Sequence, residues 1–412
     1  MLYFRHNELV ERFRVSLKTV HNWIDAAKQG KLELQLHVHN GRTYIANTAK
    51  NNTILETQAE KGKKYRNTLH NRVVTPGASF YNLYNRRQIL DIISNIEIHR
   101  EIPRQYNYLD GGATNWDNWL KRLEKEDSPN ILKGTLELIQ TNLGALELLL
   151  EGYKRINIID IGVGNARPVK ELLEYLLKRN LLHRYVAIDI SESMLQIAEQ
   201  NIKNWFGDKI TFEGHVRDIT YERFDDLLVD DMLANKADET LNLVLFLGAT
   251  LINFRSTSDV LRVVYGSMGP DDLLVYSDKP DTEAARHYFD FNPQPGLTEL
   301  SPNHRFILDL MNIDKSLYDV EMGFNEETRM RYVRIRLKTT LTINFKFEDG
   351  EREVHLEKGD TILLLRVWHL TTLEILAEFE KIGFILLQSS LTRDRQFQLT
   401  ISALESRSTR DL

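Results

Sequence analysis

The chain has 412 residues, of which 42% are hydrophobic and 27% charged, and this length and composition predict two or three globular domains. The formal net charge of -6 argues against a protein that coats nucleic acid with its whole surface. The absence of cysteine excludes disulfides, thiolate metal sites and cysteine nucleophiles, and it fits a reducing compartment.

No segment has the pattern of a secretory signal or a membrane span. Charged residues interrupt every apolar stretch of the opening sequence MLYFRHNELVERF. The longest apolar runs, such as LVLFLGATLI, are far shorter than the ~20 residues that a membrane-spanning helix needs. We therefore expect a cytoplasmic protein.

Residues 1–50 have the pattern of a small module of two helices and a β-hairpin. Apolar residues recur with helical spacing over Leu9–Phe13 and again over Val20–Ala27, and Ser16 is placed to cap the second helix. Gly30 ends that helix, and the alternating residues on either side of Asn40-Gly41 predict the hairpin. This order of elements is that of a winged helix-turn-helix.

The segments VSLKTVHNWIDAAKQGKL and GRTYIA resemble parts of the excisionase- and MerR-type DNA-binding modules. The resemblance implies a second helix in the major groove and a wing on phosphate, with DNA contacts from Ser16, Lys18, Thr19, His21, Asn22 and Arg42. DNA is therefore one expected partner, and the alternative is a helix-turn-helix used for protein contacts or dimerisation. His37 and His39 share one strand face, but the histidines show no ligand spacing elsewhere, and no metal is expected.

The polar stretch after the module reads as a linker with some helix, and a helical pattern with aromatic residues follows it. LKGTLELIQTNLGALELLLEG then predicts an amphipathic helix that leads into the main domain. The predicted boundaries are 1–50 for the winged helix-turn-helix, 51–76 for the linker, 77–129 for a helical part, 130–280 for the cofactor-binding core, and 281–412 for the remaining helix and strands.

The segment INIIDIGVGNARPVKELLEYLLKR carries the main cofactor signal. Ile156–Ile161 is a short apolar run typical of a buried parallel strand, and it ends in a turn that contains Asp160, Gly162 and Gly164. Pro168 is expected to open the following helix. A strand, glycine turn and helix present backbone N–H groups to a ligand, and glycine allows the ligand to approach closely.

Two acidic signals follow in the order that a nucleoside cofactor requires. YVAIDIS predicts a second strand that ends at Asp189, whose carboxylate can accept both ribose hydroxyls. ITFEGHVRDI predicts a third strand before Asp218 and Ile219, which suit the edge and face of adenine. The DxGxG form lacks the third glycine of a dinucleotide site, so it favours S-adenosylmethionine over NAD. Ser191 and Phe246 are further expected cofactor contacts.

The segment Leu241–Phe254 resembles the ergothioneine-pathway histidine Nα-methyltransferases, whose phrase FLGSTIGNF stands here as FLGATLINF. FYNLYNRRQILDIISNIEIHREIPRQY and DDLLVYSDKPD resemble two further segments of that family, and the resemblance runs from about residue 79 to residue 404. It implies that Asn253 holds the carboxylate of an amino-acid substrate, the alternative being a loop-capping asparagine. It also implies that Tyr81 and Tyr84 are lid residues over the cofactor, with Tyr81 as a cofactor contact and Tyr84 as a substrate contact, and that Tyr288 binds substrate.

The chain departs from this family where the substrate side chain would be read. A Glu and a Ser read the imidazole of histidine in the family, whereas DTILLLRVWHLTTLEIL places Leu365 and Val367 at those positions. Neither side chain can hydrogen-bond an imidazole, which argues against histidine as the substrate. The apolar pair favours a more apolar side chain, while Arg366 and His369 are candidates to read a different polar group.

The sequence thus predicts an α/β fold: a Rossmann-like sheet with helices on both faces and a small N-terminal winged helix-turn-helix. Strong alternation from Met330 to Leu365 adds an antiparallel insertion on the substrate side. We expect an enzyme that N-methylates an amino acid or related small molecule, with Tyr288 or His369 as a proton relay. The alternatives are a DNA-binding regulator that senses the cofactor, and a methyltransferase whose macromolecular target docks on the N-terminal module. The loop sequence GATLIN, which lacks an NPPY-type tetrapeptide, argues against nucleobase methylation.

Overall fold

The computed structural model describes residues 3–13, 15–70, 72–228, 239–248, 250–288 and 299–405, with the backbone alone for 62–70 and 287–288. The chain divides into two compact units. Unit 1 comprises Met1–Val73 and Thr339–Thr342, and unit 2 comprises Val74–Lys338 and Ile343–Leu412.

Unit 1 is built from the elements that the sequence predicts. Helices α1 (His6–Phe13) and α2 (Leu17–Lys28) precede a sheet of order β1-β3-β2, made of β1 (Tyr3–Phe4), β2 (Leu36–His39) and β3 (Arg42–Ala46). The Ser16 hydroxyl accepts the Thr19 N–H at 3.1 Å and so caps α2. Asn40 and Gly41 have positive φ, as a tight hairpin turn requires. The identification of these elements as a winged helix-turn-helix stays a prediction.

Unit 1 extends past the boundary expected at residue 50. Helix α3 (Ala49–His70) follows the hairpin, and its Leu55 is fully buried in the same apolar cluster as Leu9, Val20 and Trp23. The helix expected within the linker over residues 51–76 thus begins at Ala49, and its first turns belong to the module core. The strand β4 (Arg72–Val74) lies at the boundary between the two units.

The residues proposed to contact DNA lie mostly at the surface of unit 1. Lys18, His21 and Asn22 are exposed on one side of α2, and Arg42 is exposed at the start of β3. Thr19 is half-buried, and the exposed Ser16 hydroxyl is engaged in the cap of α2. Their role in DNA binding stays a prediction.

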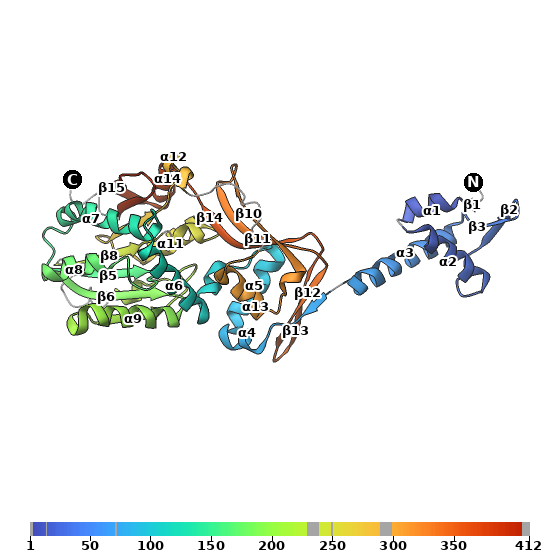
Figure 1. Ribbon diagram of the computed structural model, residues 1–412, viewed down its shortest axis with the longest axis horizontal. Helices are drawn as coiled ribbons and strands as arrows, with labels where there is room; N and C mark the ends of the chain where they lie inside the picture. The colour runs from blue at the N-terminus through green and yellow to red at the C-terminus, as the bar shows by residue number, and fades with distance from the viewer. Residues whose placement is uncertain are drawn as a thin grey trace. The chain divides into compact units, whose positions relative to one another are not determined.

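A seven-stranded sheet of order β15-β16-β9-β8-β5-β6-β7 forms the centre of unit 2 (Figure 1). Strands β5 to β9 pair in parallel, while β16 is antiparallel to both of its neighbours. The strands are β5 (Arg155–Ile161), β6 (Leu182–Asp189), β7 (Phe212–Val216), β8 (Thr240–Phe246), β9 (Leu273–Asp278), β15 (Phe384–Leu391) and β16 (Gln398–Leu404). The predicted Rossmann-like α/β sheet is confirmed.

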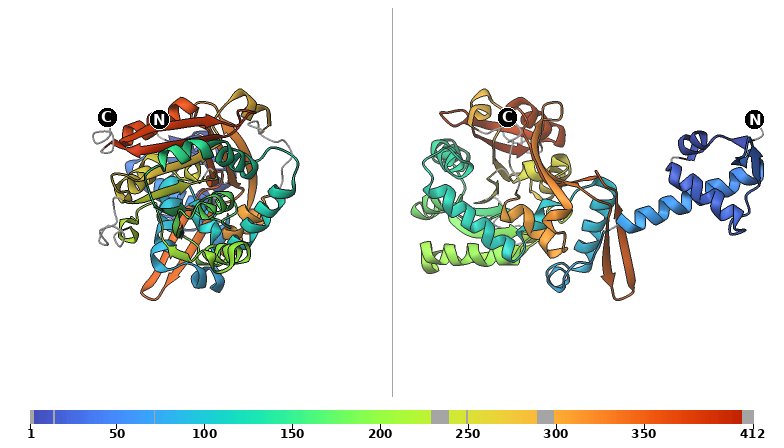
Figure 2. Two further views of the ribbon diagram at one scale, coloured as in Figure 1. Left: turned by 90° about the vertical axis from the view of Figure 1, so that its left-hand side faces the viewer. Right: turned by 45° about the vertical axis from the view of Figure 1, so that its right-hand side comes forward.

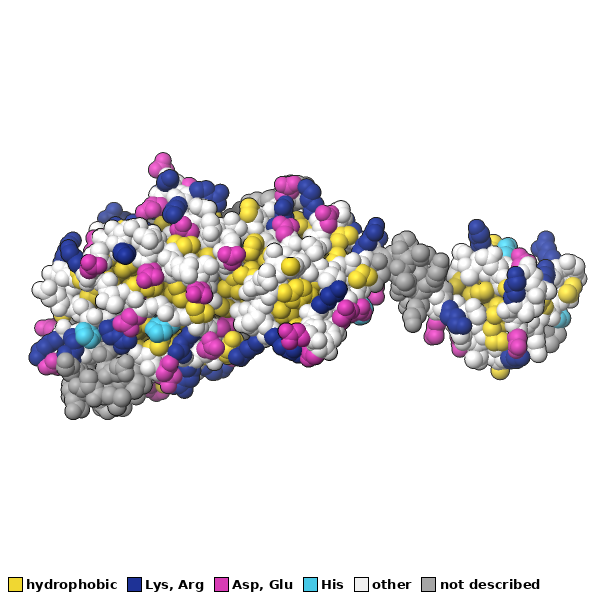
Figure 3. Space-filling view, turned by 90° about the horizontal axis from the view of Figure 1, so that it is seen from below, with side chains coloured by type: hydrophobic (Ala, Val, Ile, Leu, Met, Phe, Trp, Pro, Cys, Tyr) yellow, Lys and Arg dark blue, Asp and Glu magenta, His cyan; other side chains and the backbone are white. Residues whose placement is uncertain are grey.

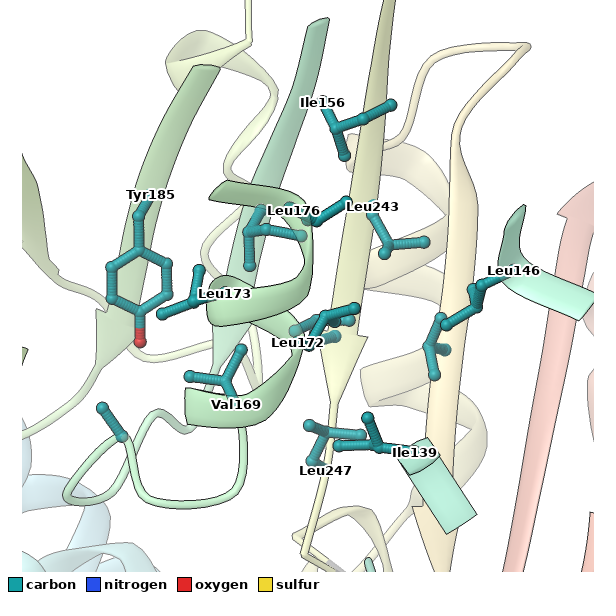
Figure 4. Close-up of a cluster of buried hydrophobic side chains, with 14 of the residues drawn as sticks. Ile139, Leu146, Ile156, Val169, Leu172, Leu173, Leu176, Tyr185, Leu243 and Leu247 are labelled. Atoms are coloured by element: carbon teal, nitrogen blue, oxygen red, sulfur yellow. The ribbon is translucent and has the colours of Figure 1, made fainter. Parts of the chain in front are cut away.

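Helices cover both faces of this sheet (Figure 2) because successive strand residues point to opposite sides. Ile156 and Ile158 pack under α7 (Ile131–Leu149), α8 (Lys170–Lys178) and α9 (Glu192–Phe206), where Figure 4 shows the leucines of α8 against the strands. Ile159 and Ile161 pack against α11 (Thr257–Ser267) and α14 (Thr372–Ile382) on the other face. Helix α8 begins two residues after Pro168, which lies in the preceding turn.

The chain also contains a second sheet, a β-hairpin, and further helices and turns. A second sheet has the order β10-β11-β14, with β10 (Tyr318–Asn325), β11 (Met330–Leu337) and β14 (Thr361–Trp368). The predicted alternation around Asp349-Gly350 forms β12 (Leu341–Phe347) and β13 (Gly350–Leu356). The other helices and turns are α4 (Ala78–Leu83), α5 (Arg86–His99), η1 (Arg104–Tyr108), α6 (Gly111–Lys125), η2 (Gly207–Lys209), η3 (Asp225–Leu227), η5 (Leu251–Asn253), α12 (Glu283–Tyr288), α13 (Pro302–Leu310) and η6 (Lys315–Leu317).

The described surface mixes side chains of both charges, in line with the modest net charge of the whole chain. On the face drawn in Figure 3, the described acidic and basic side chains are interspersed with apolar ones. Within the described residues, no helix has both the length and the apolar character required to cross a membrane.

Candidate functional site

The site begins where the strand order reverses, between β5 and β8, at the carboxyl ends of the parallel strands. The turn after β5 is left-handed at Gly162 (φ 66°) and Gly164 (φ 56°), which disfavours residues with a Cβ. A Cβ on Gly162 would lie 3.1 Å from the Thr250 Cγ2, and one on Gly164 would lie 3.4 Å from the Trp116 Nε1. Both glycines line a cavity, here named the glycine-turn cavity.

Two carboxylates lie on the wall of the glycine-turn cavity. Asp189 ends β6, and its carboxylate accepts the Ser191 N–H at 3.0 Å. Burial raises the pKa of Asp189 to about 6, although backbone N–H groups oppose the shift. Asp218 follows β7 beside Ile219, and burial raises its pKa too, despite a 2.6 Å hydrogen bond from the Thr220 hydroxyl. Carboxylate acceptors therefore lie at or just after the ends of two neighbouring strands, and the apolar side chain of Ile219 lines the same cavity.

Three expected cofactor contacts lie outside the wall of this cavity. Asp160 is 4% exposed, and its carboxylate accepts the Tyr185 hydroxyl at 3.0 Å beneath the glycine turn. The buried Ser191 caps α9 by accepting the Met194 N–H at 3.2 Å. Phe246 is fully buried in the apolar layer between the sheet and α11. All three lie behind the wall of the glycine-turn cavity, and their contact with the cofactor stays a prediction.

The buried Asp160 predicts a pH dependence of stability. Burial raises its pKa to about 7, above the value near 4 of an unfolded chain, so the folded state binds this proton more tightly. Its stabilising contribution is complete below pH about 4 and is lost as the pH rises through about 7. We expect Asp160→Asn to flatten part of the fall in the free energy of unfolding between pH 5 and pH 8, measured by denaturant titration without cofactor. Asp208→Asn, at an exposed position, is the control, and equal pH dependence in all three proteins would contradict the prediction.

A second and larger cavity of about 720 Å³ adjoins the first and is here named the wide cavity. Its volume is that of a site for a small metabolite. It is lined by residues of η1, α6, α13 and the second sheet, together with the loops that follow β8 and β9: Arg104, Asn107, Tyr108, Asn115, Trp116, Asn118, Trp119, Arg122, Ile131, Gly248, Ile252, Asn253, Lys279, Ser301, Pro302, Asn303, His304, Arg331, Leu365, Val367 and His369.

The two cavities share part of their walls. The shared residues are Arg104, Tyr108, Trp116, Gly248 and Asn253. The Arg104 guanidinium donates to the Asn253 Oδ1 at 2.8 Å and also to the Tyr108 hydroxyl. The Tyr108 and Trp116 rings pack edge to face, with centroids 5.3 Å apart. A group held at this junction contacts both cavities at once.

The predicted site residues of β14 point to opposite faces of the strand. Leu365 and Val367 line the wide cavity, as successive odd positions of a strand do. Arg366 points to the opposite side, where its Nη2 lies 2.6 Å from Glu101 Oε2 in a largely buried ion pair. This alternation corrects the prediction that Arg366 reads the substrate.

His369 lines the wide cavity and is 1% exposed. Burial, together with the nearby charges of Lys279 and Arg331, lowers the pKa of its imidazole to about 3. The ring is therefore neutral near pH 7, but so low a pKa makes it a weak proton acceptor.

Tyr81 and Tyr84, which the sequence predicts at the site, are not found on the walls of the two cavities. The buried Tyr84 hydroxyl donates to the Tyr106 carbonyl oxygen at 2.8 Å, and the Tyr81 hydroxyl accepts the Lys346 N–H at 2.8 Å. Neither residue lines the glycine-turn cavity or the wide cavity, which corrects their assignment as a lid. Tyr288 is the last residue of α12, and its side chain lies outside the described residues.

Sequence reasoning missed Arg104, Tyr108 and Trp116, although they line both cavities. The phrase REIPRQY, which carried part of the family resemblance, contains Arg104 and was the available signal. No comparable pattern marks Trp116 in α6, because only packing brings this helix over the glycine turn.

A model of the histidine-specific, SAM-dependent methyltransferase family matches residues 86–403, the range that holds every residue lining the two cavities. No curated protein sequence matches the chain. Among solved structures, an S-adenosylmethionine-dependent methyltransferase from Clostridium acetobutylicum is similar at 10% identity and a TM-score of 0.39, over 71% of this chain and 98% of that one. The CcbJ methyltransferase from Streptomyces caelestis is similar at 11% identity and a TM-score of 0.38, over 71% and 95%.

Proposed function

We propose that this chain, which belongs to the histidine-specific, SAM-dependent methyltransferase family, methylates the amine of an amino acid or related small molecule other than histidine. The chain is a SAM-dependent methyltransferase, and the identity of its acceptor is the proposal. The observation that carries it is the shared wall of the two cavities, where a methyl donor in one meets an acceptor in the other.

The residues of the glycine-turn cavity fit S-adenosylmethionine. Gly162 and Gly164 leave space that a Cβ would fill, Asp189 offers a carboxylate to ribose hydroxyls, and Asp218 with Ile219 offers an acceptor and an apolar face to adenine. When bound, the cofactor supplies a methyl group already activated on a sulfonium. The protein then has to align an acceptor and exclude water.

Asn253 is the proposed anchor for the acceptor carboxylate. Its Oδ1 accepts from Arg104, which makes Nδ2 the donor end of the amide at the junction. Arg104 adds a positive charge beside the same spot and also donates to Tyr108. The carboxylate would be held next to the methyl donor, with the neighbouring amine in reach of it.

The wide cavity itself favours a neutral amine, which is the form that attacks. Lys279 is an amine on its wall, and its pKa is well below the ordinary value because of burial and the charge of Arg331. An acceptor amine in the same surroundings experiences the same two effects, so its ammonium form is disfavoured. We propose that this environment, rather than a strong base such as His369, supplies the nucleophile.

Leu365 and Val367 argue against histidine as the methyl acceptor. Both line the wide cavity, and neither can accept or donate a hydrogen bond through its side chain. An imidazole nitrogen held against these two side chains finds no hydrogen-bond partner there, and an unpaired buried polar group costs about 1–3 kcal/mol.

The test is calorimetry with S-adenosylhomocysteine, followed by a panel of free amino acids that includes histidine. We expect tight binding of S-adenosylhomocysteine, and an amino acid other than histidine that binds only in its presence and is then methylated. Binding of S-adenosylhomocysteine with no amino-acid binding would contradict the proposed acceptor class. Preferred binding of histidine would contradict its exclusion.

The N-terminal unit keeps its predicted role as a DNA-contacting or protein-docking module. A chain that begins at Arg72, and so keeps β4, separates this role from the chemistry. Turnover of a free amino acid by the shortened chain would favour a small-molecule enzyme over one whose target docks on the module.

A further inference from the structure

A cluster of basic side chains lines one part of the wide cavity. It comprises Lys279 after β9, His304 on α13, Arg331 on β11 and His369 after β14, here named the basic cluster. Arg331 is the common member, because its charge lowers the pKa of Lys279, His304 and His369. Four chain segments that are far apart in sequence thus bring their basic groups to one wall.

The strand register places Arg331 beside the apolar pair of β14. In the antiparallel pairing of β11 with β14, Arg331 lies directly opposite Val367 and Val333 opposite Leu365. Directly opposite residues point to the same face of a sheet, with Cβ atoms about 4.5–5.5 Å apart. A side chain resting on Leu365 and Val367 would therefore place its end near the Arg331 guanidinium.

The wall of the wide cavity carries one sign of charge. Arg104, Arg122, Lys279 and Arg331 line it, and among the described residues no aspartate or glutamate does. Asp281 is the nearby carboxylate that acts on His369, but Arg286 and Arg329 already hold it at 2.5 and 2.6 Å. A low-dielectric cavity with cationic walls attracts an anion more strongly than the same charges do in water.

We infer that the basic cluster recognises an anionic group, carboxylate or phosphate, on the side chain of the acceptor. This inference rests on the proposed function, in which Asn253 and Arg104 hold the α-carboxylate at the junction of the cavities. The side chain passes over Leu365 and Val367, and its anionic end pairs with Arg331. An anion held there would also favour the ammonium form of Lys279, whose pKa is lowered by burial and by the charge of Arg331. The acceptor class is then an amino acid with an acidic side chain, which would also offset the mutual repulsion of the cationic groups.

The experiment compares isosteric ligands on the full chain saturated with S-adenosylhomocysteine. The probes are L-glutamate, L-aspartate and O-phospho-L-serine, with L-glutamine and L-asparagine as neutral counterparts and L-histidine as a third class. We expect at least one acidic probe to bind about 30-fold more tightly than its neutral counterpart, with an affinity that falls as ionic strength rises. Carboxylate and phosphate side chains are distinguished by which acid binds best.

Two variants test the assignment to the basic cluster. Arg331→Met and Lys279→Met keep most of the side-chain volume. The first removes the guanidinium charge, and the second removes the amine that a bound anion would hold in its ammonium form, so each should weaken binding of the acidic probe by about 30-fold and leave binding of the neutral probe unchanged. Arg334→Met is the matched control, because Arg334 lies on the same strand but pairs with Glu321 and does not line the cavity. Unchanged affinity for S-adenosylhomocysteine shows that each variant is folded.

The outcomes separate this inference from the proposed function. Equal or tighter binding of neutral or basic amino acids would overturn the anionic side chain and leave an amino-acid acceptor intact. Equal affinity of Arg331→Met and the unaltered chain for the acidic probe would also overturn the anionic side chain and leave an amino-acid acceptor intact. Failure of every amino acid to bind in the presence of S-adenosylhomocysteine would instead remove the proposed acceptor class itself.

Discussion

Replacing Asp189 with asparagine should weaken S-adenosylhomocysteine binding by about 10- to 100-fold, because a hydrogen bond to a charged group is worth about 1.5–3 kcal/mol. The asparagine keeps the size of the side chain and an oxygen for the Ser191 N–H, so the turn into α9 stays in place. What it loses is the negative charge and one acceptor for the ribose hydroxyls. Calorimetric titration of the variant and the unaltered chain at pH 8 measures the difference.

The pH dependence of the same titration is a second signature of Asp189. Because the pKa of this carboxyl is about 6 before ligand binds, cofactor affinity should fall as the pH drops below about 6. The Asp189→Asn protein should lack that fall, while Asp208→Asn, on the exposed turn after α9, should keep it. Equal affinity of Asp189→Asn and the unaltered chain at pH 8 would place the ribose elsewhere.

Replacing Asn253 should weaken binding of the acceptor without weakening binding of the cofactor. We expect Asn253→Ala to reduce the affinity for the acceptor amino acid by about 10- to 100-fold, since it removes the amide donor to a carboxylate. Asn253→Asp is the sharper variant, because it keeps the contact with Arg104 but replaces the donor Nδ2 with a negatively charged oxygen. That charge should repel the acceptor carboxylate, so its loss of affinity should equal or exceed that of Asn253→Ala.

The loop-capping alternative for Asn253 predicts a different pattern. If Asn253 only holds its loop, both variants should lower the temperature of unfolding and weaken S-adenosylhomocysteine and the acceptor together. Calorimetry with each ligand and thermal unfolding of the same samples separate the two roles. Asn204→Ala, at an exposed position of α9, serves as the neutral control.

The fold explains what the two apolar residues of β14 adjoin at the positions where the resembled family has polar side chains. The sequence showed that Leu365 and Val367 stand where the resembled family has polar side chains, and it suggested an apolar substrate. The structure places Arg331 directly opposite Val367, so the apolar pair and a cation share one wall. The expected reader of the substrate, Arg366, points away and pairs with Glu101. The strand-to-strand register decides this difference, and no local pattern encodes it.

The sequence by itself determined the parts of the site that consist of consecutive residues. The apolar run of β5, the glycines after it, and the acidic ends of β6 and β7 are local patterns, so Gly162, Gly164, Asp189 and Asp218 could be placed on the same cavity in advance. The order of the strands then implied the Rossmann-like sheet. Ser16 as a helix cap and Asn40-Gly41 as a hairpin turn were predictable for the same reason.

Only the tertiary structure decided which distant segments complete the site. Arg104 and Trp116 reach the glycine turn because η1 and α6 pack over the strand ends, and Lys279 and Arg331 line one cavity because β9 ends and β11 begins there. Burial likewise places Phe246 in the apolar layer behind the glycine-turn cavity, and Tyr84 outside the walls of both cavities. Periodicity along the chain records the secondary structure and the buried face of each element. The register, the packing of separate elements and the resulting sign of charge in a cavity depend on contacts between residues far apart in sequence.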